Sequence, residues 1–354
     1  MVKFLGPSCF NDGTSLTNHS TLAPRPSPQT TYMFWSNSKS KNALLHRYVD
    51  MWAFMGMHPT NIDLLQKLKK AEDNAFGANM DVCGTVTQKD LKSGKWNQSH
   101  LLGIRADIWN PDSEQQSSIL NRLQSDRKET LRKEIKRSGK LSQAQSKNLE
   151  RQLDRDPVLK MESCDIENRR LVMKLFKSGD HNIRWTGTVE EIVTRELHNS
   201  LGAKKTILSF AAILQGYEYM TYVQENNRTF RVPSIYSFNY FDQKRDRMWY
   251  LKIKRKWVSV GADFTVESQN EKVGEIDGAL IGLGYNAHVY VYEPTLAKDR
   301  QFTDLLTLFT STVGYHSAMR KSLRRRIKAT RKGLCVQNII EDEEFRLLKN
   351  PRAA

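Results

Sequence analysis

The hydrophobic pattern is clearest near the carboxy terminus, over residues 302–319. No Asp, Glu, Lys or Arg occurs in the fifteen residues from Leu305 to Met319, where apolar residues recur at spacings of three and four among Thr, Ser and Gly. A helix that is apolar or neutral most of the way round is normally enclosed by other structure. The pattern therefore predicts a buried helix. We do not expect a transmembrane segment, because fifteen uncharged residues are fewer than the ~20 that span a bilayer.

Alternating patterns precede this helix. Between residues 249 and 254 every second residue is apolar, which is typical of a strand with one face toward a core. One helix is expected from Thr188, where Thr188 and Glu191 match a capping box. Further strands are expected at residues 170–177, 183–185, 206–215, 217–224, 229–232, 257–266, 273–278 and 280–283. Many strands with one final apolar helix predict a closed antiparallel β-barrel around that helix, since closure removes exposed strand edges.

The amino-terminal half has a different pattern. Residues 1–41 are rich in Ser, Thr and Pro with one acid, which predicts a disordered tail. Apolar residues on one face predict a helix over residues 44–55, and a second helix is expected from Thr60 to about residue 75. Short strands are expected between residues 77 and 109. The first part of the chain is therefore expected to be mixed but largely helical.

A charged segment follows at residues 113–157. Its apolar residues are sparse, and Ser138-Gly139 divides it, so we expect two polar helices that form an extended arm. The arm is either a solvated insertion or a docking element for a protein partner. The sequence thus predicts an α+β chain with four parts. They are a tail at 1–41, a helical region at 42–157, a barrel at 158–332 and a carboxy-terminal tail at 333–354.

Four segments of the carboxy-terminal third carry a resemblance to a known family. They are Ile253, the sequence WVSVGADF at residues 257–264, the sequence GEIDG at residues 274–278, and the apolar helix at residues 302–319. Together they resemble the tubby C-terminal-like superfamily, and within it the LURP-one-related proteins and phospholipid scramblases. The resemblance implies a non-enzymatic barrel. Tubby-type members bind phosphoinositides through basic surface residues, although the resemblance assigns this role to no particular position.

The chain is strongly basic. It has 55 Lys and Arg against 39 Asp and Glu, which gives a formal charge of +16 and an isoelectric point near 9.6. Such an excess indicates a polyanionic partner. Between Arg320 and Lys332 eight basic residues occur without an acid. The residues expected to bind an anionic headgroup or a phosphate are Lys252, Lys254, Arg255, Lys256, Arg320, Lys321, Arg324, Arg325, Arg326 and Lys328. Anionic phospholipid is the first hypothesis. The alternatives are a nucleic acid or an acidic protein as the ligand, or a role as a scaffold subunit of a larger assembly.

Catalytic motifs are missing from the sequence. It has no Walker loop, nucleophile elbow, dinucleotide glycine fingerprint or His-Glu-x-x-His, and its eight histidines are scattered. We therefore expect no enzymatic activity, no metal and no cofactor. Four widely separated cysteines indicate a reducing, intracellular compartment. The acid-poor leader leaves a mitochondrial location open beside a cytoplasmic or peripheral membrane one.

Overall fold

The computed structural model describes residues 42–51, 80–111, 113–137, 156, 158–162, 169–178, 183–227, 233–257, 261–279, 285–332 and 344–345. The described residues belong to one compact unit that begins at Asn42. Several expectations lie outside these ranges. They are the tail at 1–41, the helix from Thr60, the second arm helix, the strands at 229–232 and 280–283, and nearly all of 333–354.

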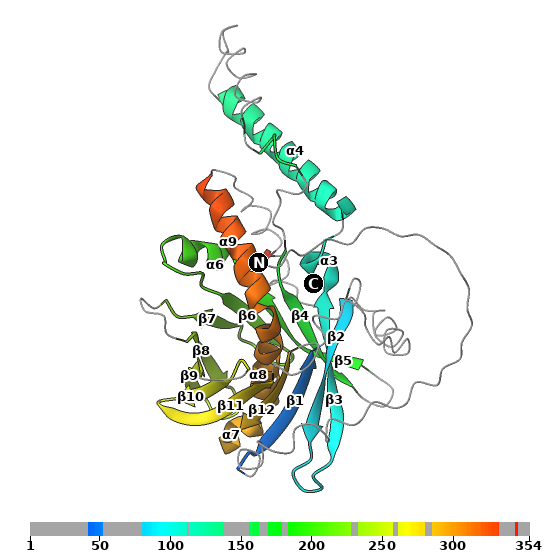
Figure 1. The fold of residues 1–354 in the computed structure, drawn as a ribbon, viewed down its shortest axis with the longest axis vertical. Helices are drawn as coiled ribbons and strands as arrows, with labels where there is room; N and C mark the ends of the chain where they lie inside the picture. The colour runs from blue at the N-terminus through cyan, green and yellow to red at the C-terminus, as the bar shows by residue number, and fades with distance from the viewer. Residues whose placement is uncertain are drawn as a thin grey trace, which may run out of the picture. The chain divides into compact units, whose positions relative to one another are not determined.

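In the described residues, twelve antiparallel strands form a closed barrel (Figure 1). Neighbours in sequence pair throughout, and β1 closes the ring by pairing with β12, with Leu45 opposite Val291. The strands are β1 (Leu45–Met51), β2 (Met80–Lys89), β3 (Trp96–Arg105), β4 (Val172–Ser178), β5 (Ile183–Glu191), β6 (Ser209–Leu214), β7 (Thr221–Glu225), β8 (Ile235–Asp242), β9 (Arg247–Arg255), β10 (Phe264–Ser268), β11 (Glu271–Ala279) and β12 (Asn286–Val291). The predicted barrel is therefore confirmed, but it begins at Leu45 and not at residue 158.

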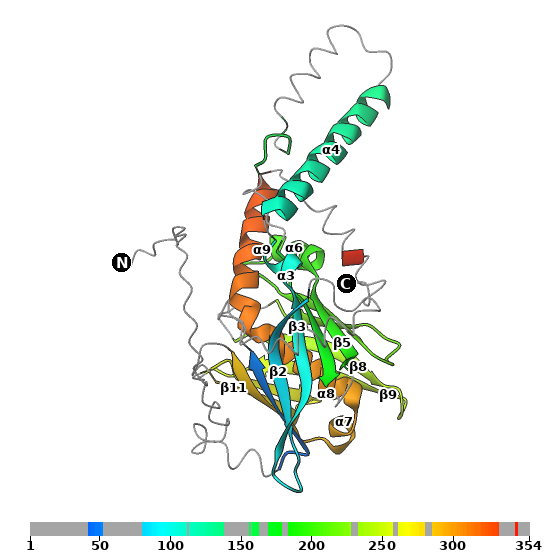
Figure 2. The same cartoon turned by 90° about the vertical axis from the view of Figure 1, so that its right-hand side faces the viewer.

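The enclosed helix is also confirmed. Helix α8 (Arg300–Thr312) lies within the ring of strands, and every residue from Phe302 to Thr312 is buried (Figure 2). Leu308 and Phe309 are 0% and 2% exposed. The barrel wall approaches the helix closely, because a Cβ at Gly187 of β5 would lie 2.9 Å from Leu308 Cδ1. A side chain at position 187 would therefore force Leu308 or Leu214 to shift where α8 crosses β5.

The prediction of one continuous helix over residues 302–319 is wrong in its last part. A short 3₁₀ turn, η3 (Val313–Tyr315), separates α8 from α9 (His316–Arg331). A Cβ at Gly314 would lie 2.9 Å from Tyr285 Cβ, so this turn packs against the start of β12 only with glycine at that position. The chain then leaves the barrel as α9, which carries the basic residues. The other helices of the described residues are α3 (Ala106–Trp109), α4 (Ser113–Arg137), α6 (Val193–Leu201) and α7 (Pro294–Ala297).

The helix predicted over residues 44–55 is wrong, because Leu45–Met51 is strand β1. Leu45 and Val49 belong to the barrel core, whereas His46 and Tyr48 face outward. These outward side chains are nevertheless buried, and the ring of Trp96 lies edge-on to His46 with centroids 4.7 Å apart. A strand covered on both faces loses its alternation of apolar and polar residues. That loss made the pattern of β1 resemble one face of a helix.

The capping box predicted at Thr188 is also wrong. Thr188 lies within β5, and α6 begins only at Val193. The first amides of α6 are bound from a distant part of the chain, since the Glu344 carboxylate accepts hydrogen bonds from Val193 N and Thr194 N. Thr194 Oγ1 also donates to Glu344 Oε2 over 2.7 Å. A long-range carboxylate thus caps the helix that Thr188 and Glu191 were expected to cap.

The first arm helix is confirmed as α4. It packs through Leu123 against Val158 and Met161. Gln124 Nε2 donates to the carbonyls of Leu159 and Met161, and Arg127 pairs with Asp156. These contacts join α4 to the residues that follow the arm.

Candidate anion-binding surface

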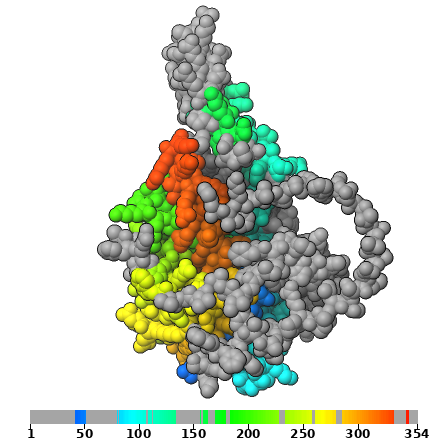
Figure 3. Space-filling view, in the orientation of Figure 1, coloured from blue at the N-terminus to red at the C-terminus, as the bar shows by residue number. Residues whose placement is uncertain are grey.

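Helix α9 has a buried face and an exposed face. Met319, Ser322, Leu323 and Arg326 are buried on one side. The opposite side carries basic side chains separated by one, three or four residues, so they form one stripe along the helix. We call these exposed residues the α9 stripe: Lys321, Arg324, Arg325, Lys328, Arg331 and Lys332. In the space-filling view, α9 lies at the surface above the strands of the β9–β11 meander (Figure 3).

Arg320 belongs to the barrel rim and not to the stripe. Its Nη2 lies 2.9 Å from Glu225 Oε2, and its Nη1 donates to Thr206 O over 2.8 Å. Glu225 is 1% exposed and also accepts from Leu208 N and Ser234 Oγ. Because a buried carboxylate needs a charge partner, the main role of Arg320 is to neutralise Glu225.

Arg326 fixes α9 to the protein. It is 6% exposed, its Nη2 donates to Arg169 O, and its Nε donates to Ser322 Oγ over 3.4 Å. Burial raises the pKa of the Glu191 carboxyl, and the Arg326 guanidinium opposes that rise. Arg326 therefore contacts the interior and is not available to a ligand at the surface.

The end of β9 meets the start of α9 at Ser234. Arg255 N donates to Ser234 O over 2.9 Å, and Arg320 Nη2 donates to Ser234 Oγ over 3.4 Å. Arg255 and Lys252 are exposed, whereas Lys254 pairs with Glu267 and Lys256 pairs with Glu275. The sequence run at 252–256 thus divides into exposed cations and cations held by neighbouring strands.

Two exposed aromatic side chains accompany these cations. Trp257, just after β9, is 74% exposed, and Tyr250 on the outer face of β9 is 60% exposed. Trp249 points the other way and is buried, as its alternation with Tyr250 predicted. Arg247 covers the Trp249 ring, with its Cζ 4.0 Å from the ring centroid.

Six of the ten predicted residues are therefore exposed, and the other four are partly or fully buried. Lys321, Arg324, Arg325 and Lys328 share the α9 stripe, while Lys252 and Arg255 lie on β9. The prediction omitted Arg331 and Lys332, whose spacing extends the stripe. It also included four residues held elsewhere, which are Lys254, Lys256, Arg320 and Arg326.

Among the described residues, no group of three or more His, Cys, Asp and Glu side chains is placed to hold a metal ion. No helix in the described ranges combines the length and the apolar character that crossing a bilayer requires.

The chain was compared with models of protein families, with curated proteins and with solved structures. None of them matches it.

Proposed function

We propose that this chain is a non-enzymatic protein that binds anionic phospholipid surfaces of the phosphoinositide type through the α9 stripe. The observation that carries the proposal is the exposure of six basic side chains on one side of a helix whose other side is fixed to the barrel. Each Lys or Arg close to an anionic membrane contributes about 1 kcal/mol of binding free energy. Six of them suffice for peripheral binding at low ionic strength.

The exposed aromatic residues support the same proposal. Trp and Tyr side chains favour the membrane–water interface, because one part of the ring is apolar and another part is polar. Trp257 follows the exposed Arg255 by two residues, so an aromatic and a cation are close together at the rim from which α9 starts. The resemblance to tubby-like barrels favours the same class of ligand.

Nucleic acid is the alternative polyanion, since the same cations would neutralise its phosphates. Single-stranded nucleic acid is usually held by bases stacked on aromatic rings. Trp249 is buried beneath Arg247 and offers no exposed face for stacking. The exposed rings of Trp257 and Tyr250 would serve either ligand, so vesicle flotation and RNA binding are compared directly.

Vesicle flotation of the full chain tests the proposal. Vesicles of phosphatidylcholine are compared with vesicles that also contain phosphatidylserine and phosphatidylinositol 4,5-bisphosphate. We expect the chain to float with the anionic vesicles only, and the variant Arg324→Glu/Arg325→Glu/Lys328→Glu to remain in solution. Circular dichroism should be unchanged, because these side chains are exposed.

A matched control applies the same change of charge to exposed residues of α4, as Arg122→Glu/Lys128→Glu/Arg132→Glu. Equal loss in the control would contradict a role of the α9 stripe. A gel shift with single-stranded RNA on the same preparations tests the alternative. RNA binding without vesicle binding would replace the proposal, and binding to neither would leave an acidic protein as the partner.

A further inference from the structure

A cavity of about 640 Å³ lies at the amino-terminal end of α8, which is the end away from α9. Its walls come from β1, the β2–β3 hairpin, the start of β3, the end of β4, and Arg300 at the first position of α8. Helix α8 has 13 residues, so its two ends lie about 18 Å apart. Since α9 starts beyond the far end of α8, the cavity is separate from the α9 stripe. Its volume is in the range of small-molecule sites.

Basic residues outnumber acidic residues in the lining of the cavity. Five of its residues are Lys or Arg, and Asp90 is its one acid among the described lining residues. The five cations are Arg47, Lys89, Lys92, Lys177 and Arg300. The Asp90 carboxylate is engaged within the hairpin, where it accepts from Lys92 N over 2.9 Å and from Ser93 Oγ over 2.6 Å. The cavity therefore offers more positive than negative charge to a ligand.

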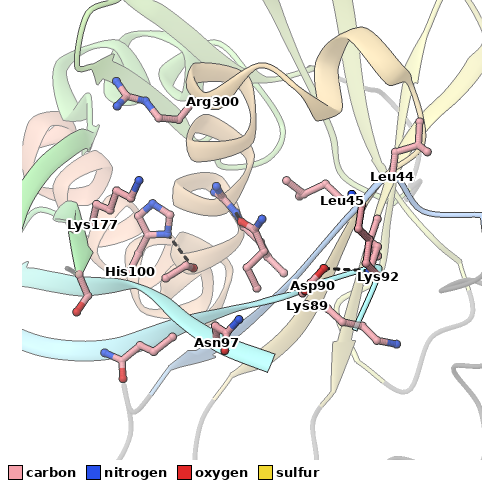
Figure 4. Close-up of a pocket in the computed structure, with 15 residues that line it drawn as sticks. Leu44, Leu45, Lys89, Asp90, Lys92, Asn97, His100, Lys177 and Arg300 are labelled. Carbon is pink, nitrogen blue, oxygen red and sulfur yellow. Dashed lines mark hydrogen bonds between the residues drawn. The ribbon is translucent and has the colours of Figure 1, made fainter. Parts of the chain in front are cut away.

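The cations stand on two sides. In the close-up, Lys177, Arg300 and His100 lie on one side of the pocket, and Lys89 and Lys92 lie on the other (Figure 4). A single small anion would contact only one of these two groups of basic side chains. A ligand with two phosphate groups would reach both, because the two groups come from different walls.

Arg47 is held in place at the floor of the cavity. Its Nη1 donates to Asp304 Oδ1 over 2.8 Å and to Thr307 Oγ1 over 3.0 Å, and its Nε donates to Gln88 Oε1 over 3.2 Å. A guanidinium fixed by three bonds loses little conformational entropy when a ligand binds. Asp304 neutralises part of its charge, and Arg300 is oriented by a hydrogen bond from its Nη2 to Gln215 O over 3.1 Å.

The pKa of His100 is affected by burial and by the positive charges that line the cavity. Burial, together with the smaller effects of the charges of Arg47, Lys177 and Arg300, lowers the pKa of His100 to about 2. The imidazole is therefore neutral at physiological pH. Its Nδ1 lies 3.0 Å from Ser99 Oγ, and its Nε2 lies 3.6 Å from Asp304 Oδ1.

The remaining lining residues indicate what joins the phosphates. Asn97, Gln98 and Ser178 supply amide and hydroxyl groups, which bind hydroxyl groups well. Leu44, Leu45 and Leu91 supply apolar surface for a carbon skeleton. The described lining residues include no Phe, Tyr or Trp on which a nucleobase could stack. We propose that this cavity binds a small polyol that carries two or more phosphate groups.

Calorimetric titration of the full chain with fructose 1,6-bisphosphate and with pyrophosphate tests this inference. We expect binding of one molecule per chain, and we expect Lys92→Ala/Lys177→Ala to weaken it at least tenfold, since each lost charge-assisted contact costs about that factor. Lys95→Ala is the matched control. Lys95 is exposed on the same hairpin but does not line the cavity. The affinity of the Lys95→Ala variant for both probes should therefore stay within about twofold of the wild type.

The α9 variant Arg324→Glu/Arg325→Glu/Lys328→Glu should also keep its affinity for fructose 1,6-bisphosphate. This result would show that the cavity binds its ligand independently of the proposed membrane surface.

Phosphorylated polyols occur free and as phosphoinositide headgroups. If the headgroup is the ligand, Lys92→Ala/Lys177→Ala loses flotation with phosphatidylinositol 4,5-bisphosphate vesicles; if a free molecule is the ligand, flotation is unchanged. Failure of both probes to bind at about 1 mM, or an equal loss in Lys95→Ala, would overturn the inference.

Discussion

Arg320 on α9 and Glu225 on β7 form an ion pair at the barrel rim, with 2.9 Å between Nη2 and Oε2. Lys205 lies farther from the same carboxylate, with Nζ 3.6 Å from Oε1. The pair connects the first turn of α9 to the barrel wall. It also divides the basic run, because Arg320 stabilises the fold whereas Lys321 beside it is exposed.

Removal of Arg320 should destabilise the protein. Arg320→Ala leaves the buried Glu225 with the more distant Lys205, and breaking a buried pair costs about 3 kcal/mol. Lys321→Ala should change the free energy of unfolding by less than about 0.5 kcal/mol, since the side chain is exposed. Urea denaturation followed by circular dichroism measures both. Equal stability of the two variants would show that the ion pair contributes nothing.

The enclosed helix gives a second prediction. Leu308 is fully buried beside β5, so Leu308→Ala should lower the free energy of unfolding by about 2–5 kcal/mol. Leu201→Ala is the control, because Leu201 is exposed at the end of α6. Thermal or urea unfolding compares the two. A cost at Leu308 no greater than at Leu201 would contradict the packing of α8 inside the barrel.

The buried carboxyl of Glu190 on β5 gives a pH prediction. Burial raises the pKa of Glu190 from 4.5 to about 7, against the opposing charge of Arg170. Between pH 4.5 and 7 the folded protein keeps this proton while the unfolded chain releases it. The free energy of unfolding therefore falls as pH rises through this window, by on the order of 3 kcal/mol.

Glu190→Gln removes this titration while keeping the side-chain shape. The variant should lose less stability than the wild type between pH 4.5 and 7, and it should be the more stable protein at higher pH. Glu218→Gln serves as the control, since Glu218 is exposed and should leave the profile unchanged. Urea unfolding at a series of pH values measures the difference. Parallel profiles for the wild type and Glu190→Gln would contradict the assignment.

The barrel and its helix were predictable because their signals are local. An uncharged run of helical length needs no distant residue to be recognised, and buried and exposed residues alternate in β9 from Met248 to Ile253. The turn between β10 and β11 was also predictable, since Gln269 and Asn270 adopt positive φ, a conformation that Asn tolerates. In β1 the alternation of apolar and polar residues is absent, because His46 and Tyr48 on its outer face are buried by Trp96 and His288.

The candidate surface was predictable only in part. The spacing of Lys321, Arg324, Arg325 and Lys328 marks one face of a helix, so the stripe follows from the sequence. The structural roles of Arg320 and Arg326 do not follow from it. Their partners Glu225 and Arg169 are far away in sequence, and charge composition alone does not distinguish a paired arginine from an exposed one.

The arm at 113–157 should be removable, together with residues 158–166, because Val158 and Met161 pack against Leu123 of α4. The residues on either side of this deletion are held together, because Arg170 N donates to Ile108 O over 3.4 Å and Arg169 Nη2 donates to Asn110 Oδ1 over 2.9 Å. A short Gly/Ser bridge in place of residues 112–166 therefore needs to span only a small distance. We expect the shortened protein to keep the circular dichroism of the barrel and a cooperative thermal transition. Loss of that transition would show that α4 contributes to the stability of the barrel.

The most direct test of the central claim is the partition coefficient onto anionic vesicles as the α9 stripe is neutralised one charge at a time. The series is Lys328→Gln, then Arg325→Gln added, then Arg324→Gln added, with Arg122→Gln on α4 as the control. Because each cation contributes about 1 kcal/mol, each step should lower the coefficient about fivefold. The control should equal the wild type. A flat series, or a fivefold loss in Arg122→Gln, would contradict binding through α9.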